Sequence, residues 1–142
     1  RGVLDRTVLI VTADHGEQFG EHGSFGHGLG LYDEEVRVPL LIRAPGIAPA
    51  GRVVAEDVGL RDVAATALDL SAASAPPLPG RSLARLWGEP PAAASPAFSE
   101  LRGRVDERYA RPDLDGDDDP PGSWKSVVVD GWSYIRRGDG RE

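Results

Sequence analysis

The chain has 142 residues, of which 40% are apolar and 27% charged, enough for one ordinary globular domain with a core of moderate size. Its formal net charge of −7 argues against non-specific binding to nucleic acid or anionic membranes, and no apolar run is long enough to span a bilayer. The absence of cysteine excludes a disulfide framework, a thiolate metal site and a cysteine nucleophile within these residues. Because the sequence begins at Arg1 without a methionine and enters a predicted strand almost at once, we expect a piece of a longer protein, so that the absence of a visible signal peptide leaves the compartment unknown.

The first predicted element is a strand at residues 7–12, TVLIVT, a continuous run rich in β-branched residues. Such a run predicts a strand that is buried on both faces, typically in a parallel sheet between helices. Asp14 and His15 follow directly, at the end of the strand where open α/β sheets bind ligands. A carboxylate and an imidazole suit a hard or borderline divalent cation, so we predict that both are metal ligands, with further ligands supplied from elsewhere.

A loop is predicted next, because six glycines lie between residues 16 and 30. His27 stands between two of these glycines and has little core to pack against, which makes it a candidate oxyanion donor or proton donor to a leaving group. His22 is a second candidate for substrate binding, although our default expectation is that its side chain is simply exposed to solvent. The competing interpretation is structural, since an isolated Asp-His-Gly is commonly a turn and an isolated loop histidine is commonly solvated.

Three elements are predicted in the next forty residues. Residues 31–36 favour a helical turn, and residues 38–43, VPLLIR, predict a second buried strand that ends before a Pro-Gly pair. Apolar residues then recur at helical spacing, which predicts an amphipathic helix over about residues 59–71 with Asp57 as its N-cap.

The C-terminal half alternates Pro-rich connections with short elements. The expected segments are a linker at 71–80, a short helix at 81–88, a connection at 89–96, a strand at 97–101 and a solvated acidic loop at 111–122. The acidic loop fails as an EF-hand, because Asp118 stands where that loop needs glycine and Trp124 where it needs glutamate. Two strand-like runs flank Asp130-Gly131, the dipeptide that a type I′ turn favours, and predict a β-hairpin.

These motifs together resemble the C-terminal portion of the catalytic domain of sulfatases, within the alkaline phosphatase superfamily. The specific part of the resemblance consists of five short stretches: Thr12–Glu17 (TADHGE), Gly20–Gly23 (GEHG), Gly26–Gly28 (GHG), Leu31–Glu34 (LYDE) and Arg37–Leu40 (RVPL). Weaker likeness continues through the predicted helix, the PGRSLARLWGE segment and the final hairpin, so that it covers nearly the whole chain except the acidic insert.

The resemblance implies a fold and a site. Residues 1–88 would be part of an α/β, alkaline-phosphatase-like, mostly parallel sheet flanked by helices, and residues 89–142 a small antiparallel subdomain. Asp14 and His15 would bind a divalent cation, in the first place Ca²⁺, with Mg²⁺ or Mn²⁺ as alternatives. His27 falls where the family has a Lys or His that contacts sulfate, phosphate or leaving-group oxygens. Arg37 and the Asp-Glu-Glu segment before it would be structural.

The implied function is metal-dependent hydrolysis of a small-molecule or glycan sulfate ester. The family's nucleophile, a formylglycine made from Cys or Ser, and an acidic pair that completes the metal site belong to an N-terminal part that this sequence does not contain. We therefore expect the 142 residues alone to be inactive, with the missing N-terminal part as their partner.

Two alternatives remain open at this point. Many arylsulfatases have Asn where this chain has His15, and an Asp-His pair occurs in other sulfatases, in phosphonate monoester hydrolases and in phosphoethanolamine transferases. A phosphodiesterase, phosphonate hydrolase or phosphotransferase of the same superfamily is therefore the second hypothesis, and a non-catalytic binding domain on this scaffold is the third. The upstream nucleophile separates the first two, and metal binding separates either from the third.

Overall fold

The computed structural model describes residues 2–71, 76, 78–88, 95–101 and 124–137. The chain divides into two compact units. The first unit comprises Arg1–Thr12, Pro39–Ala97 and Val129–Gly131, and the second comprises Ala13–Val38, Phe98–Val128 and Trp132–Glu142.

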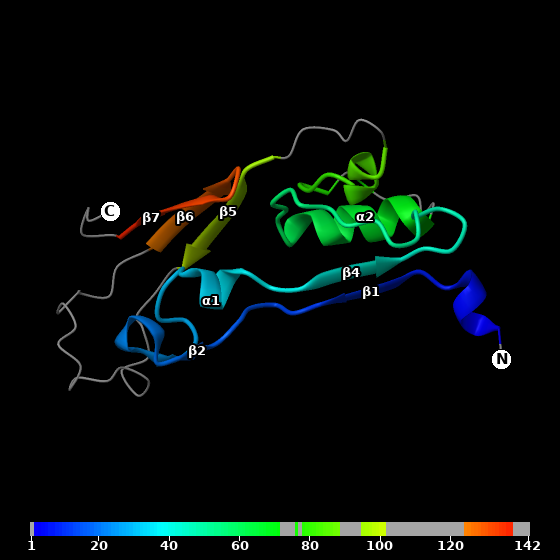
Figure 1. Cartoon of the computed structure of the whole chain (residues 1–142). Coiled ribbons are helices and arrows are strands. Elements are labelled where there is room, and N and C mark those ends of the chain that lie inside the picture. Colours follow the sequence, from blue (N-terminus) through cyan, green and yellow to red (C-terminus); the bar gives the residue numbers. More distant parts are fainter. Residues whose placement is uncertain (1, 72–75, 77, 89–94, 102–123, 138–142) are drawn as a thin grey trace. The chain divides into compact units, whose positions relative to one another are not determined.

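The first unit contains a two-stranded sheet. A short 3₁₀ helix, η1 (Val3–Arg6), precedes strand β1 (Leu9–Thr12), which pairs with β4 (Leu40–Arg43) (Figure 1). Both strands lie within the ranges that the sequence predicts. Their pairing is antiparallel, with Leu9 opposite Arg43, whereas the sequence predicted a mostly parallel sheet. The described residues therefore establish an α/β chain with antiparallel pairing between these two strands.

The side chains of β1 and β4 are more exposed than expected. Leu9, Val11 and Leu41 are 40%, 51% and 58% exposed, so the prediction that both strands are buried on two faces is wrong for the described chain. The exposed side chains lie on one face of the two-stranded sheet, where the described residues give little cover, whereas Ile10 and Ile42 on the other face are half-buried.

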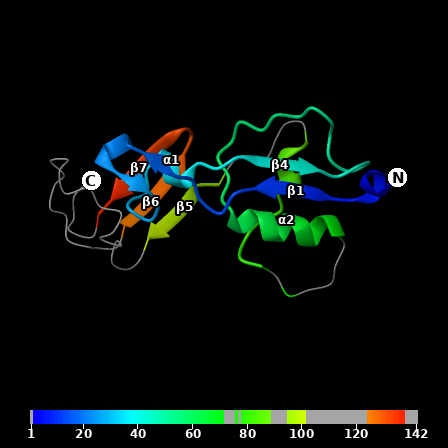
Figure 2. The same ribbon diagram turned by 90° about the horizontal axis from the view of Figure 1, so that it is seen from below.

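Helix α2 (Arg61–Ser71) packs on η3 (Leu83–Leu86), which is a single 3₁₀ turn inside the predicted helix at 81–88. In both views α2 runs beside the β1–β4 pair (Figures 1 and 2). Leu83 and Leu86 are almost fully buried. The buried Thr66 hydroxyl donates to the Asp62 carbonyl at 2.6 Å and accepts from the Leu83 N–H at 2.9 Å. These bonds satisfy polar groups that burial would otherwise make costly.

The predicted N-cap of this helix is wrong. The helix begins at Arg61, and the Asp57 carboxylate instead accepts a hydrogen bond from the Gly131 N–H at 3.0 Å. Asp57 thus supports a tight turn that lies far away in the sequence. A capping residue is predicted from its neighbours along the chain, and this tertiary contact overrides that local preference.

The second unit holds the glycine-rich stretch, which is a small hairpin rather than a plain loop. Strand β2 (Gln18–Phe19) pairs antiparallel with β3 (Phe25–Gly26), and the 3₁₀ turn η2 (Glu21–Gly23) joins them. Helix α1 (Asp33–Val36) confirms the predicted helical turn at 31–36. A Cβ atom at Gly16 would overlap the Glu34 carbonyl oxygen, so the close approach of this segment to α1 requires glycine there.

The C-terminal strands form a three-stranded sheet in the order β5 (Ala97–Leu101), β6 (Trp124–Val129) and β7 (Trp132–Arg136) (Figure 1). Asp130 and Gly131 have φ values of 50° and 76°, as a type I′ turn requires, so the predicted hairpin is confirmed. The acidic loop at 111–122 and most of the predicted connections at 71–80 and 89–96 lie outside the described residues. No helix in the described part of the chain is long and apolar enough to cross a membrane.

Candidate active site

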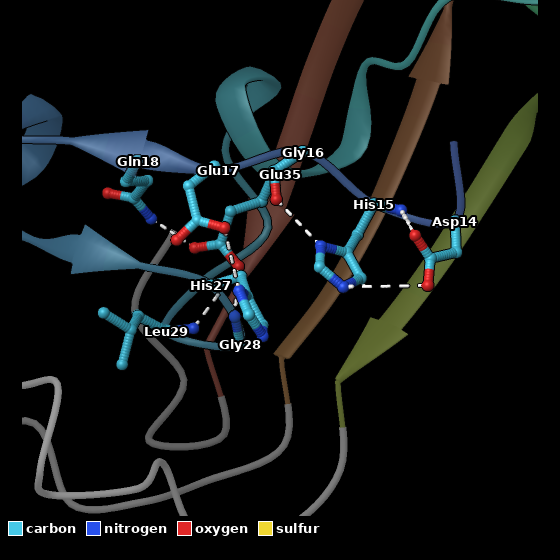
Figure 3. A network of polar contacts seen from close by, with 9 residues as sticks. All are labelled: Asp14, His15, Gly16, Glu17, Gln18, His27, Gly28, Leu29 and Glu35. Carbon is cyan, nitrogen blue, oxygen red and sulfur yellow. Dashed lines mark hydrogen bonds and ion pairs between the residues drawn. The ribbon is translucent and has the colours of Figure 1, made fainter. Parts of the chain in front are cut away.

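Asp14 and His15 lie directly after β1 and face each other. The His15 backbone N–H donates to Asp14 Oδ1 at 3.1 Å, and His15 Nε2 lies 3.8 Å from Asp14 Oδ2 (Figure 3). The Asp14 side chain is 91% exposed and that of His15 is 46% exposed. The carboxylate and imidazole that the sequence singled out are thus adjacent and accessible.

The second ring nitrogen of His15 is held by the backbone. Nδ1 lies 2.8 Å from the Gly16 carbonyl oxygen, which can only accept, so Nδ1 carries the proton of the neutral ring and Nε2 carries the lone pair. Metal-binding histidines are commonly held in this way. The bond to Gly16 raises the pKa of His15; desolvation opposes that rise, and the carboxylates of Asp14, Glu17 and Glu35 add to it.

His27 lies against the same group. Its ring centroid is 4.3 Å from that of His15, with the planes tilted by 32°, and its Nδ1 donates to Glu17 Oε2 at 2.9 Å (Figure 3). The strand register explains the pairing, because Gln18 faces Gly26 across β2 and β3 and the next two residues outward are Glu17 and His27. The hairpin therefore brings together two side chains that are ten residues apart in the sequence.

The donor atoms suit a divalent cation. Two ligands of one such ion lie about 3–4 Å apart, because each sits about 2.0–2.6 Å from the metal, and the Asp14 Oδ2 to His15 Nε2 separation falls in that range. His15, Glu17 and His27 also each offer a ligand atom within 4.8 Å of the others. The residues present therefore fit a cation, with His15 common to both donor sets.

Glu35 organises the backbone around His27. This glutamate of α1 is only 5% exposed, and its carboxylate accepts hydrogen bonds from the Gly28 N–H at 2.6 Å, the Leu29 N–H at 3.3 Å and the Gln18 side-chain amide. Sequence reasoning assigned its segment only a general supporting role. The sequence showed only that Glu35 precedes the apolar Val36 at the end of a predicted helical turn. This position does not indicate that the Glu35 side chain is buried.

His22, the other predicted substrate-binding residue, packs elsewhere in this unit. Its ring stacks on Tyr32 at 3.6 Å between centroids, and its Nε2 lies 3.5 Å from Glu34 Oε2. The Tyr32 hydroxyl in turn accepts from Arg137 at 3.1 Å. His22 is thus part of an aromatic stack, whereas His15 and His27 form the close pair.

Arg37 behaves as a surface residue. Its side chain is 81% exposed, and its guanidinium lies 3.8 Å from the Asp33 carboxylate one helical turn earlier. Exposed pairs of this kind contribute little to stability, which fits the minor structural role expected from the sequence.

Comparison with known proteins places these residues in a family context. The family model described as Sulfatase matches residues 1–73, which include β1, the Asp14–His15 pair, the hairpin and α2. Arylsulfatase K of Mus musculus is 41% identical over 85 residues, which are 59% of this chain and 15% of that protein.

Two further relatives match over a similar stretch. The arylsulfatase of Volvox carteri is 47% identical over 76 residues, which are 51% of this chain and 12% of that protein. The extracellular sulfatase SULF-1 homolog of Drosophila melanogaster is 41% identical over 83 residues, which are 58% of this chain and 7% of that protein. The chain thus spans only a small share of the length of these relatives. Because the family model matches more than half of its residues, the chain belongs to the sulfatase family.

Proposed function

We propose that the protein carrying this chain hydrolyses sulfate esters, and that Asp14 and His15 hold a divalent cation together with ligands from another part of the protein. The observation that carries the proposal is the proximity of three groups: the Asp14 carboxylate, the His15 ring beside it, and the His27 ring 4.3 Å from that of His15. Membership of the sulfatase family and the names of the relatives support the choice of ester.

Each residue has a distinct role in this proposal. Asp14 and His15 would hold a cation, Ca²⁺ in the first place with Mg²⁺ and Mn²⁺ as alternatives, which would stabilise the negative charge that develops on the ester oxygens. His15 presents Nε2 to the cation because the Gly16 carbonyl holds the proton at Nδ1. His27 donates a hydrogen bond or a proton to the leaving-group oxygen, a role that contributes about 10²–10⁴-fold when the donor is well positioned.

The proposal extends to the rest of the enzyme. We infer that β1 and β4 belong to a larger alkaline-phosphatase-like sheet, which would cover the apolar side chains exposed here. The nucleophile, a formylglycine, is assigned to a segment outside these 142 residues. The 142 residues alone are accordingly expected to have no esterase activity, and adding the longer protein's N-terminal part is expected to restore it.

The test compares variants of the longer protein on aryl sulfates and on the matching aryl phosphates. Asp14→Asn, His15→Ala and removal of divalent cations with EDTA are each expected to lower sulfate hydrolysis by about 100-fold or more, and re-adding one cation identifies the metal. Asp33→Asn is the control, because that carboxylate pairs only loosely with an exposed arginine. Hydrolysis of the phosphate but not the sulfate would overturn the proposed substrate class.

His27→Ala separates the acid role from simple binding. Loss of a proton donor slows esters with poor leaving groups more than activated aryl esters, because only poor leaving groups need the proton. An equal and negligible loss on both kinds of ester would exclude the acid role of His27.

A further inference from the structure

We propose that Glu17 is a positioning residue for His27: its carboxylate holds the ring proton at Nδ1 and the ring plane in place, so that Nε2 is the atom presented to the ester. This inference rests on the proposed sulfate ester hydrolysis. It assigns Glu17 a function that neither its sequence position nor the family resemblance supplied.

The first support is geometric. His27 Nδ1 and Glu17 Oε2 are 2.9 Å apart, the distance of a charge-assisted hydrogen bond between a ring N–H and a carboxylate. The two side chains are 51% and 40% exposed, so a substrate can reach the ring without breaking this bond.

The second support is that the backbone on both sides is fixed. Glu17 precedes β2 and His27 follows β3, and the antiparallel register of these strands places the two residues opposite each other. The N–H of the next residue, Gly28, is held by the buried Glu35 carboxylate at 2.6 Å. Glu35 therefore fixes the peptide and Glu17 fixes the ring, which are separate contributions.

The third support is chemical. In a free neutral histidine the Nε2–H tautomer is the more populated, which would leave the lone pair on Nδ1. A carboxylate that accepts from Nδ1 reverses this preference, as the aspartate does in hydrolases with a Ser-His-Asp triad. When His27 carries a second proton, that proton sits on Nε2 and passes to the leaving oxygen as its bond to sulfur breaks, and the ring returns to the Nδ1–H form.

A different use of the same atoms has to be excluded. His15, Glu17 and His27 each offer a ligand atom within 4.8 Å of the others, and two imidazoles with one carboxylate suit Zn²⁺. In that arrangement Glu17 would be a metal ligand and its carboxylate would not accept from His27. The experiment therefore includes a metal titration.

The first measurement does not depend on activity. Long-range ¹H–¹⁵N spectra of the ¹⁵N-labelled chain resolve the ring nitrogens of its three histidines, assigned by single His→Gln variants. At a pH where the rings are neutral, His27 is expected in the Nδ1–H form and is expected to change to the Nε2–H form in Glu17→Ala. His15 is the internal control, because its Nδ1 proton is held by the Gly16 carbonyl in both proteins.

The second measurement uses the longer protein and a series of aryl sulfates. Glu17→Ala is expected to lower kcat by about 10- to 100-fold on poor leaving groups, with a smaller loss on activated ones and little change in KM. Glu17→Gln, which keeps an accepting oxygen, is expected to retain an intermediate rate. Asp33→Asn is the matched control and is expected to match the parent protein.

Three results would overturn the inference. One is an Nε2–H ring at His27 in the parent chain, or no change of tautomer in Glu17→Ala. Another is a leaving-group dependence that Glu17→Ala leaves unaltered. The last is stoichiometric Zn²⁺ binding that is lost in Glu17→Ala, which would make Glu17 a metal ligand. If the protein hydrolyses no sulfate ester at all, the proposed function fails, while the spectra still decide whether Glu17 sets the tautomer.

Discussion

The two ring nitrogens of His15 face different kinds of group. The Gly16 carbonyl takes the Nδ1 proton at 2.8 Å, and the Asp14 carboxylate faces Nε2 at 3.8 Å. Under the proposed function, the carboxylate that would stabilise a cation at Nε2 would also stabilise a proton there, so protons and divalent cations would compete for one atom.

The pKa of His15 is predicted to lie above its ordinary value of 6.5, mainly because of the hydrogen bond to Gly16. A raised pKa in the folded chain means that the protonated ring adds stability below pH 6.5 and that this contribution is lost as the pH rises through the folded-state pKa. An NMR titration in EDTA measures this pKa directly, and the Asp14→Asn variant is expected to titrate at a lower pH than the parent. A midpoint at or below the ordinary value would contradict the prediction.

The sequence was sufficient to indicate part of the candidate site. Asp14, His15 and His27 could be named because polar residues at the end of a strand lie where open α/β sheets bind ligands, and all three histidines follow one strand-like run closely. Glu17 and Glu35 could not be named in the same way. Glu17 gains its partner only through the register of β2 and β3, and Glu35 is recognisable only once its burial is known. The stacking of His22 on Tyr32 was not visible in the sequence, and its role in substrate binding stays a prediction.

At the scale of elements, helix α1 and the β2–β3 hairpin are joined through one buried side chain. The Glu35 carboxylate accepts from Gln18 in β2 and from the backbone of Gly28 and Leu29 after β3. In addition, the Gly16 N–H donates to the Glu35 carbonyl at 2.8 Å. A helix of four residues has little stability of its own, so these contacts fix its position.

Replacing Glu35 by Gln tests this junction. The amide nitrogen of glutamine cannot accept, and it replaces either Oε1, which accepts from the Gln18 amide, or Oε2, which accepts from both the Gly28 and the Leu29 N–H. At least one donor therefore loses its acceptor, at a cost of about 1–3 kcal/mol in the free energy of unfolding. Urea denaturation followed by tryptophan fluorescence measures the change. Asp33→Asn is the control, because its carboxylate lies 3.8 Å from the exposed Arg37 and such pairs contribute little. Equal stability of the two variants would contradict the assigned role of Glu35.

Element positions were predictable where local signals were strong. The Asp130-Gly131 turn and the helical periodicity ending at Ser71 each specify a conformation that their own residues enforce. The pairing of β1 with β4 was not predictable, since a short apolar run fits a parallel or an antiparallel neighbour equally well. Asp57 was misassigned because its partner, Gly131, lies 74 residues away.

At the scale of the whole chain, burial is unevenly distributed. Leu86 is 1% exposed beside α2, whereas Val11 and Leu41 on the β1–β4 pair are more than half exposed. The hydrophobic effect scales with the area removed from water, so these apolar positions contribute very differently to folding.

Substitutions at both kinds of position test this distribution. In the 142-residue chain, Val11→Thr and Leu41→Lys are each expected to change the free energy of unfolding by less than about 0.5 kcal/mol. Leu86→Ala is expected to cost about 2–5 kcal/mol, because it opens a cavity. Chemical denaturation of the three variants measures the contrast. Equal losses of unfolding free energy at Val11, Leu41 and Leu86 in the 142-residue chain would contradict this prediction, because they would show that β1 and β4 are covered. The proposed larger sheet predicts such losses only for a longer protein that contains that sheet.

The β2–β3 hairpin closes through η2 at one end and carries Glu17 and His27 beyond the other. Residues added or removed around Glu21–Gly23 therefore leave Glu17 opposite His27, since the pairing of Gln18 with Gly26 keeps the strand register. Under the proposed function, the length and character of this tip can therefore vary without displacing the Glu17–His27 pair at the base of the hairpin.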